Sequence, residues 1–189
     1  MHSALAVILV ASLAYVGTMF DNFFAFAAQL IVTDRRHFRR IAWAQALGIF
    51  TLLVVAAGAG SLLAPIPTRW IGLLCVAPWA LALHAWRHRG DVTREQFRRG
   101  SLTTFTVTLA LGGDNLAVWI PLLRAHGAGV GVATAAIFLV WECVFLLSAQ
   151  SLAGHARIVA WGTRIGPQLV PWVYLGLGVL ILVECGTFT

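Results

Sequence analysis

The sequence of 189 residues contains no lysine, so its 13 basic residues other than histidine are all arginine. The absence of lysine excludes a phosphate-binding loop of the Gly-x-x-x-x-Gly-Lys type, in which lysine contacts the nucleotide phosphates. An ATP-driven pump would therefore need a partner subunit. Acidic residues are also few, at seven, and the net charge is +6. Because no polar stretch is long enough to form a folded basic surface, we expect lipid headgroups, and no nucleic acid, as the partner of this charge.

Cysteine is also scarce, and its three positions show no metal-binding spacing. Cys75, Cys143 and Cys185 lie in apolar stretches without a C-x-x-C pattern, and their odd number excludes a complete disulfide framework. We interpret them mainly as small buried apolar residues. Cys143 and Cys185 stay secondary candidates as metal ligands, although Cys143 and Glu142 are about 100° apart on a helix and should face different sites.

Apolar residues make up 60% of the sequence, whereas a soluble globular chain has about 45–50%. This composition predicts a polytopic membrane protein. No arginine precedes Arg35, and a cleaved signal peptide normally begins with positive charge. We therefore expect the apolar run 4–32 to be the first membrane helix.

Six apolar segments predict six membrane-spanning helices, and most of the arginines lie in the loops after the first, third and fifth. Positive residues stay on the cytoplasmic side, so we expect both termini outside the cytoplasm in a protein of the inner membrane. The segments cover approximately residues 4–32, 41–63, 70–86, 101–123, 130–152 and 169–185.

An Asp-Asn pair occurs in two of these segments, as Asp21-Asn22 and as Asp114-Asn115. Each pair lies in the first of three consecutive segments. Because three is odd, the second unit would be inverted in the membrane relative to the first, as in many secondary transporters. We predict an all-α membrane protein of two inverted three-helix repeats, about 1–86 and 101–189, joined by a cytoplasmic loop at 87–100.

Four of the seven acidic residues lie inside apolar segments, where no arginine or histidine is placed to pair with them: Asp21, Asp114, Glu142 and Glu184. A charge at the bilayer centre costs about 2.5–3.5 kcal/mol on insertion scales. These acids must therefore be protonated or share a bound cation. The pattern predicts a cation transport site at which a metal ion and protons alternate.

Neutral oxygen ligands are available beside two of these acids, from the amides of Asn22 and Asn115. Gln45, near the inner end of the second segment, is a further secondary candidate. Glu142 has Ala135 and Ala149 on its helix face, which suits helix contact. For every candidate the alternative is a structural hydrogen bond that only holds the helices together.

The expected ligands favour a divalent cation without identifying it. Oxygen donors suit manganese or magnesium, and cadmium prefers soft sulfur ligands. We expect no permanently bound cofactor. The expected partners are the lipid bilayer, the divalent metal ion and protons, and homo-oligomer formation stays open.

Four stretches resemble the cadmium resistance transporter family, within the lysine-exporter superfamily. LALGGDNLAVWIPLL is similar to the family's Gly-rich Asp-Asn segment, and VPWVYLGLGVLILVECGTF to its final helix. AQALG and WIGLLCVAPWALAL also fit. The resemblance covers the whole chain and implies a six-helix inner-membrane exporter of cadmium or a related divalent cation.

By position, the resemblance assigns the metal site to Asp21, Asp114, Asn115 and Glu184. The first motif departs from the family pattern, because Asn22 stands where a second acid is expected. Relatives in the superfamily export manganese or amino acids, so both stay alternative substrates. The sequence has no buried cation to bind an amino acid's carboxylate, which disfavours the second of these.

Two other classes of protein remain as alternatives. An intramembrane aspartyl protease also needs two membrane aspartates that share a proton, but Leu111 stands where its Gly-x-Gly-Asp signature has glycine. A structural or assembly subunit would use the same acids only for helix contacts. Metal sensitivity of a deletion strain separates these classes from a metal exporter.

Overall fold

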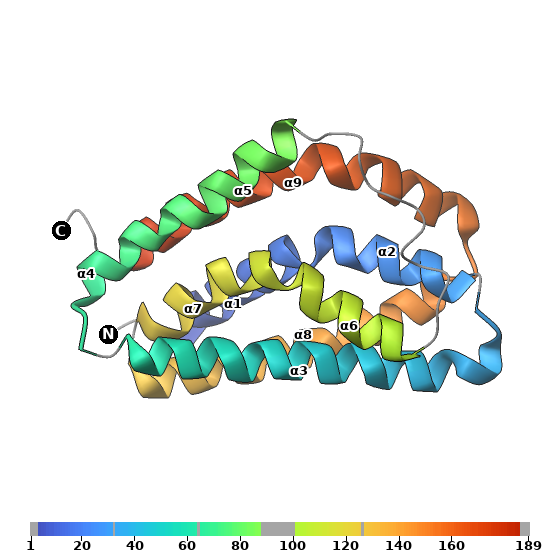
Figure 1. Cartoon of the computed structure of the whole chain (residues 1–189), viewed down its shortest axis with the longest axis horizontal. Helices are drawn as coiled ribbons and strands as arrows, with labels where there is room; N and C mark the ends of the chain where they lie inside the picture. The colour runs from blue at the N-terminus through green and yellow to red at the C-terminus, as the bar shows by residue number, and fades with distance from the viewer. Residues whose placement is uncertain (1–3, 32, 64, 88–100, 126, 186–189) are drawn as a thin grey trace.

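The computed structural model describes residues 4–31, 33–63, 65–87, 101–125 and 127–185, and every regular element in these ranges is a helix (Figure 1). The predicted all-α class is thereby confirmed for the described residues. The elements are α1 (Ala4–Thr18), α2 (Phe20–Ile31), η1 (Arg35–His37), α3 (Phe38–Leu62), α4 (Thr68–Ile71), η2 (Gly72–Cys75), α5 (Val76–Arg87), α6 (Ser101–Leu111), α7 (Gly113–Ala125), α8 (Ala128–Leu152) and α9 (Ala156–Glu184).

Within the described ranges, two helices are long and apolar enough to cross a membrane, namely α3 together with η1, and α8. The number rises to four if the bent pair α1–α2 and the two parts of α9 each count as one span. Large apolar side chains such as Val132 (71% exposed) and Leu147 (66% exposed) cover the outer face of α8. Such a face suits contact with lipid, because apolar surface is stable in hydrocarbon.

The first and fourth predicted helices are each broken, so our expectation of continuous helices was wrong there. The chain bends by 51° between α1 and α2, and Gly112 separates α6 from α7. Gly lowers helix propensity, and Asp and Asn compete for backbone hydrogen bonds. Asp21 and Asp114 are consequently each the second residue of a new helix, α2 and α7.

The sixth predicted helix begins earlier than expected. Arg157 and Arg164, which we expected in a loop, lie within α9, because that helix starts at Ala156. The helix bends by 57° between its Ala156–Gly166 and Gln168–Glu184 parts. A Gly-Pro pair stands at this bend, and proline lacks the N–H that would continue the helical ladder. The pair therefore bends the helix without ending it.

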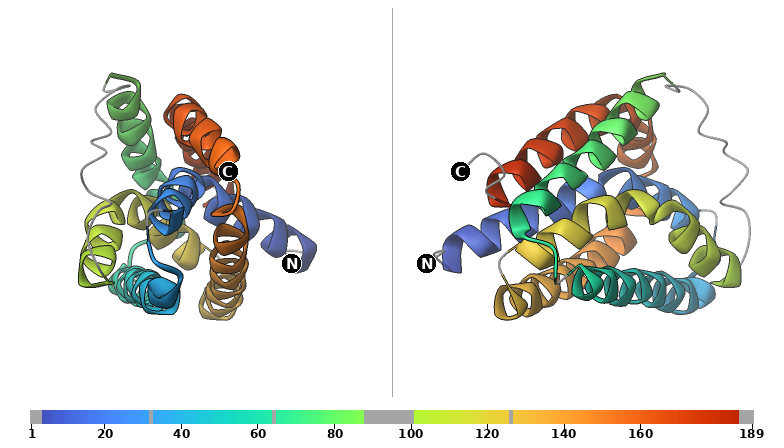
Figure 2. Two further views of the ribbon diagram at one scale, coloured as in Figure 1. Left: turned by 90° about the vertical axis from the view of Figure 1, so that its right-hand side faces the viewer. Right: turned by 60° about the vertical axis from the view of Figure 1, so that its left-hand side comes forward.

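Each broken helix packs against a long helix from the other half of the chain. α3 contacts both α6 and α7, and α8 contacts both α1 and α2. α5 lies along α9, as Figures 1 and 2 both show. The core between these layers contains Tyr15, Trp119 and Phe138, which are almost fully buried. The two Asp-Asn pairs therefore belong to the central helices.

Candidate functional site

Asp114 connects the start of α7 to α9. Its Oδ1 accepts a hydrogen bond from the backbone N–H of Asn115 at 2.8 Å, and its Oδ2 accepts one from the hydroxyl of Tyr174. A carboxylate at a helix N-terminus is stabilised by the unpaired N–H groups and the helix dipole. In this arrangement Asp114 has a donor on each oxygen.

The two Asn residues of the Asp-Asn pairs meet at one sulfur atom. Asn115 Nδ2 donates to Met19 Sδ at 3.6 Å, and Asn22 Nδ2 lies 3.9 Å from the same sulfur. Met19 and Asn115 are only 2% and 1% exposed. The structure thus brings together two motifs that are far apart in the sequence. The side chain of Asp21 lies outside the described residues, so its assignment to the site stays a prediction.

Glu142 is the acid buried most deeply among the described residues, at 4% exposed. It projects from α8, and its Oε2 accepts a hydrogen bond from the hydroxyl of Tyr15 on α1. The Tyr15 ring stacks on Trp119 of α7, with centroids 6.1 Å apart and planes 15° apart. Trp119 in turn donates from Nε1 to Thr18 Oγ1 at 3.2 Å. Glu142 therefore lies at a contact of three helices.

Two buried oxygens have no hydrogen-bond donor among the described residues, Asn115 Oδ1 and Glu142 Oε1. A buried acceptor without a donor costs about 1–3 kcal/mol, and the bilayer interior offers no water to compensate. Met19 is one turn after Tyr15, so the two side chains lie on one face of the first helix, and Asn115 and Trp119 lie on one face of α7 for the same reason. These two faces pack against each other, and both oxygens lie beside their contact. A cation could satisfy either oxygen, and a proton could satisfy the Glu142 carboxylate.

Within the described ranges no three His, Cys, Asp or Glu side chains are placed to hold one metal ion. A cation at this centre would therefore also need donors of other kinds. Other donors lie close to these residues: a Tyr hydroxyl contacts each of the acids Asp114 and Glu142, and Met19 Sδ contacts the amide of Asn115. The Asp21 carboxylate, outside the described part, is the further acid expected there.

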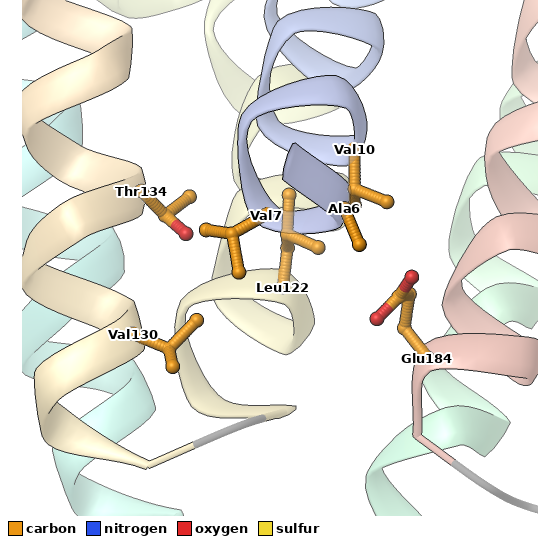
Figure 3. Close-up of a pocket in the computed structure, with 7 residues that line it drawn as sticks. All are labelled: Ala6, Val7, Val10, Leu122, Val130, Thr134 and Glu184. Atoms are coloured by element: carbon orange, nitrogen blue, oxygen red, sulfur yellow. The ribbon is translucent and has the colours of Figure 1, made fainter. Parts of the chain in front are cut away.

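Glu184 lies apart from this centre. It lines a pocket with residues of α1, α7 and α8, and Figure 3 shows its carboxylate directed from α9 toward α1, opposite Thr134. Glu184 comes ten residues after Tyr174, which is about 15 Å along the helix. The same pocket contains Leu122, two turns beyond Asn115. The pocket thus opens at the end of the bundle, displaced along the helices from the Asp-Asn pairs.

The secondary candidates lie away from the centre or have structural partners. Gln45 Oε1 accepts from Thr108 Oγ1 at 2.6 Å, which joins α3 to α6. Cys143 is exposed and Cys185 is buried. The prediction that Cys143 and Glu142 face different directions is confirmed, because one side chain is exposed and the other buried.

Sequence reasoning missed the residues that contact these acids and amides, namely Met19, Tyr15 and Tyr174. The candidates predicted from the sequence were acids, amides and cysteines, and they included no phenol and no thioether. A signal was present, because the chain has only two tyrosines and two methionines. Both tyrosines lie in apolar segments, where a phenol needs a hydrogen-bond partner.

A comparison with known protein families matches a region that begins at this centre. A family model described as cadmium resistance transporter matches residues 15–189, from Tyr15 through both Asp-Asn pairs to the end of the sequence. The chain belongs to the cadmium resistance transporter family. No curated protein and no solved structure matches it.

The family assignment and the apolar helices together identify this family member as a membrane protein. The resemblance expected from the fourth and sixth segments is confirmed, since the match includes both. The residues around Met19, Asn115 and Glu142 are therefore part of a transporter.

Proposed function

We propose that this protein exports cadmium or a related divalent cation across the inner membrane, in exchange for protons. The observation that carries the proposal is the pair of buried oxygens without donors, Asn115 Oδ1 and Glu142 Oε1. Asn115 lies on the broken pair α6–α7, and Glu142 of α8 contacts Tyr15 of the broken pair α1–α2. Broken helices form the ion sites of many secondary transporters. A purely structural role would favour oxygens that are fully hydrogen-bonded.

The exchange would occur at the carboxylates of Asp114 and Glu142, with Asp21 as the third expected acid. Tyr174 and Tyr15 donate to these carboxylates. A cation at Asp114 would compete with a hydrogen bond on either oxygen, whereas at Glu142 it could bind Oε1, which has no donor among the described residues. Proton binding to the carboxylate would release the cation again, because a neutral acid is a poor ligand. Metal and protons would thereby alternate at one site.

Two inverted repeats would place such a site at the middle of the membrane. The broken pairs α1–α2 and α6–α7 carry Asp21 and Asp114 at corresponding positions. The long helices α3 and α8 each pack on the broken pair of the other repeat. This exchange of partners is what a two-fold axis in the membrane plane would produce. With six spans, both termini would lie outside the cytoplasm.

The proposal is tested with purified protein in proteoliposomes under an imposed proton gradient. We expect cadmium flux that depends on the gradient, and its loss in Asp114→Asn and Glu142→Gln. The matched control is Asp34→Asn, because Asp34 is an exposed acid paired with Arg36 at 2.6 Å. Normal flux in Asp114→Asn or Asp114→Ala would contradict the proposed site.

Manganese is the second candidate substrate, because most of the side-chain donors at the centre carry oxygen. Oxygen ligands suit manganese better than cadmium. Flux of each metal through the same vesicles, measured alone and in competition, distinguishes the two. The sulfur atom of Met19 is the feature that favours cadmium.

A further inference from the structure

We propose that the Met19 thioether is a direct ligand of the transported cation and selects soft divalent ions over hard ones. This inference rests on the proposed transport function and names its substrate class. Met19 lies at the junction between α1 and α2, where the chain bends. Its sulfur is the atom at which the amides of Asn22 and Asn115 converge.

The spacing of these atoms fits a shared metal ion. The two amide nitrogens lie 3.9 and 3.6 Å from Met19 Sδ. Two ligands at about 2.3 Å from a tetrahedral ion are separated by about 3.8 Å. Rotation of an amide by 180° exchanges its nitrogen and oxygen without moving the helix. The same positions could therefore present oxygens to a cation that the sulfur also binds.

The rotation costs little at Asn115. Its Oδ1 is buried and has no donor among the described residues, and its Nδ2 donates only to sulfur, a weak acceptor. Rotation of the Asn115 amide from its present orientation therefore breaks no strong hydrogen bond. An oxygen turned toward a cation would gain the partner that it lacks.

Helical hydrogen bonds hold the backbone of Met19. The N–H of Met19 donates to Tyr15 O and its C=O accepts from Phe23 N, both at 2.9 Å. The side chain is buried, so water does not compete for a bound ion. Thioether sulfur is a soft ligand that binds soft cations better than magnesium or manganese. A leucine at this position would pack equally well and would bind no metal.

The first test is direct detection of the bond. In a protein with Cys75, Cys143 and Cys185 all replaced by alanine, we expect X-ray absorption at the cadmium edge to show one sulfur neighbour. In selenomethionine-labelled protein we expect selenium at bonding distance instead. Both signals should disappear in Met19→Leu, which leaves Met1 as the control methionine. A cadmium shell of oxygen and nitrogen alone in the cysteine-free protein would overturn the inference.

The second test is selectivity of transport in proteoliposomes. Met19→Leu conserves volume, and we expect it to reduce cadmium flux by about tenfold or more, which is about 1.4 kcal/mol in binding or barrier. The selectivity of the variant for cadmium over manganese, measured with both metals in competition, should fall in parallel. Thermal unfolding of the variant shows whether it is folded.

The two proposals fail in different ways. If the wild-type protein moves no divalent cation, the proposed function itself is wrong. If wild-type protein and folded Met19→Leu move cadmium equally, with equal sensitivity to manganese, transport stands and only the role of Met19 is overturned.

Discussion

Both tyrosines of the chain donate a hydrogen bond to a carboxylate in an apolar helix. Tyr15 on α1 bonds to Glu142 on α8, and Tyr174 on α9 bonds to Asp114 on α7. A phenol satisfies a buried acid without adding a charge, and it is a weaker partner than arginine would be. At the scale of single residues, the acids are therefore stabilised yet still available to a cation.

Replacement of Tyr15 by Phe should destabilise the protein by about 1–3 kcal/mol, because Glu142 loses its donor while the stacking on Trp119 is kept. The measurement is thermal unfolding of the detergent-solubilised protein. In the double variant Tyr15→Phe/Glu142→Gln the two effects should not add, since the residues are in contact. Additive effects would show that the hydrogen bond contributes nothing.

Asn115 and Gln45 are buried amides with opposite surroundings. Gln45 Oε1 has the hydroxyl of Thr108 as a partner, whereas Asn115 Oδ1 has no donor among the described residues. We expect Asn115→Ala to abolish cadmium flux in proteoliposomes and Gln45→Ala to retain about half of it or more, with a loss of stability of about 1 kcal/mol. Equal flux in the two variants would show that the orphaned oxygen has no role in transport.

At the scale of elements, close helix contacts depend on particular glycines. A Cβ at Gly178 of α9 would lie 2.1 Å from Trp79 Nε1 of α5, whereas a Cβ at Gly176 would have nothing within 4 Å. The same Trp79 Nε1 donates to Leu175 O at 3.3 Å. The Gly-x-Gly core of the final helix therefore contains one glycine required for packing and one that is not.

Gly178→Ala should destabilise the α5–α9 contact by about 1–3 kcal/mol, because the indole ring of Trp79 must move. Gly176→Ala is the matched control on the same helix, and it should be neutral or stabilising, since alanine favours the helix. Thermal unfolding of the two variants compares them directly. A larger loss in Gly176→Ala would show that α5 and α9 pack differently.

At the scale of the whole molecule, the arginines at the starts of α3 and α9 lie at one end. The start of α3, with Arg39 and Arg40, and the start of α9, with Arg157, lie at the same end of the molecule (Figure 1). The start of α1 and the end of α9 lie at the opposite end. This separation is consistent with the positive-inside rule and with termini outside the cytoplasm.

Reporter fusions test this orientation in cells. Alkaline phosphatase fused after Thr189 should be active, because that enzyme folds only outside the cytoplasm, and green fluorescent protein fused there should be dark. Insertion of the same reporters within 88–100 should give the reverse pattern. If green fluorescent protein fused at the C-terminus is fluorescent, the C-terminus lies in the cytoplasm and the proposed topology is wrong.

The sequence by itself determined the class of the protein and the residues of its family motif. Apolar composition and charge placement follow from the bilayer as a solvent, which acts on every residue alike. Asp114, Asn115 and Glu142 were identifiable as candidates because a polar side chain in hydrocarbon costs free energy unless it has a partner. The breaks at Met19 and Gly112 could not be predicted, because helix propensity alone does not choose between a continuous and a broken span.

Only the tertiary structure decided which of these residues meet. Tyr15 and Met19 are distant in the chain from Asn115 and Glu142, and their contacts depend on how the faces of α1, α7 and α8 pack. Glu184 was already expected near the outer end of its helix, and it lies at the end of α9, ten residues beyond the Tyr174 that contacts Asp114. Local sequence determines what each side chain can bind, and long-range packing determines which partners it has.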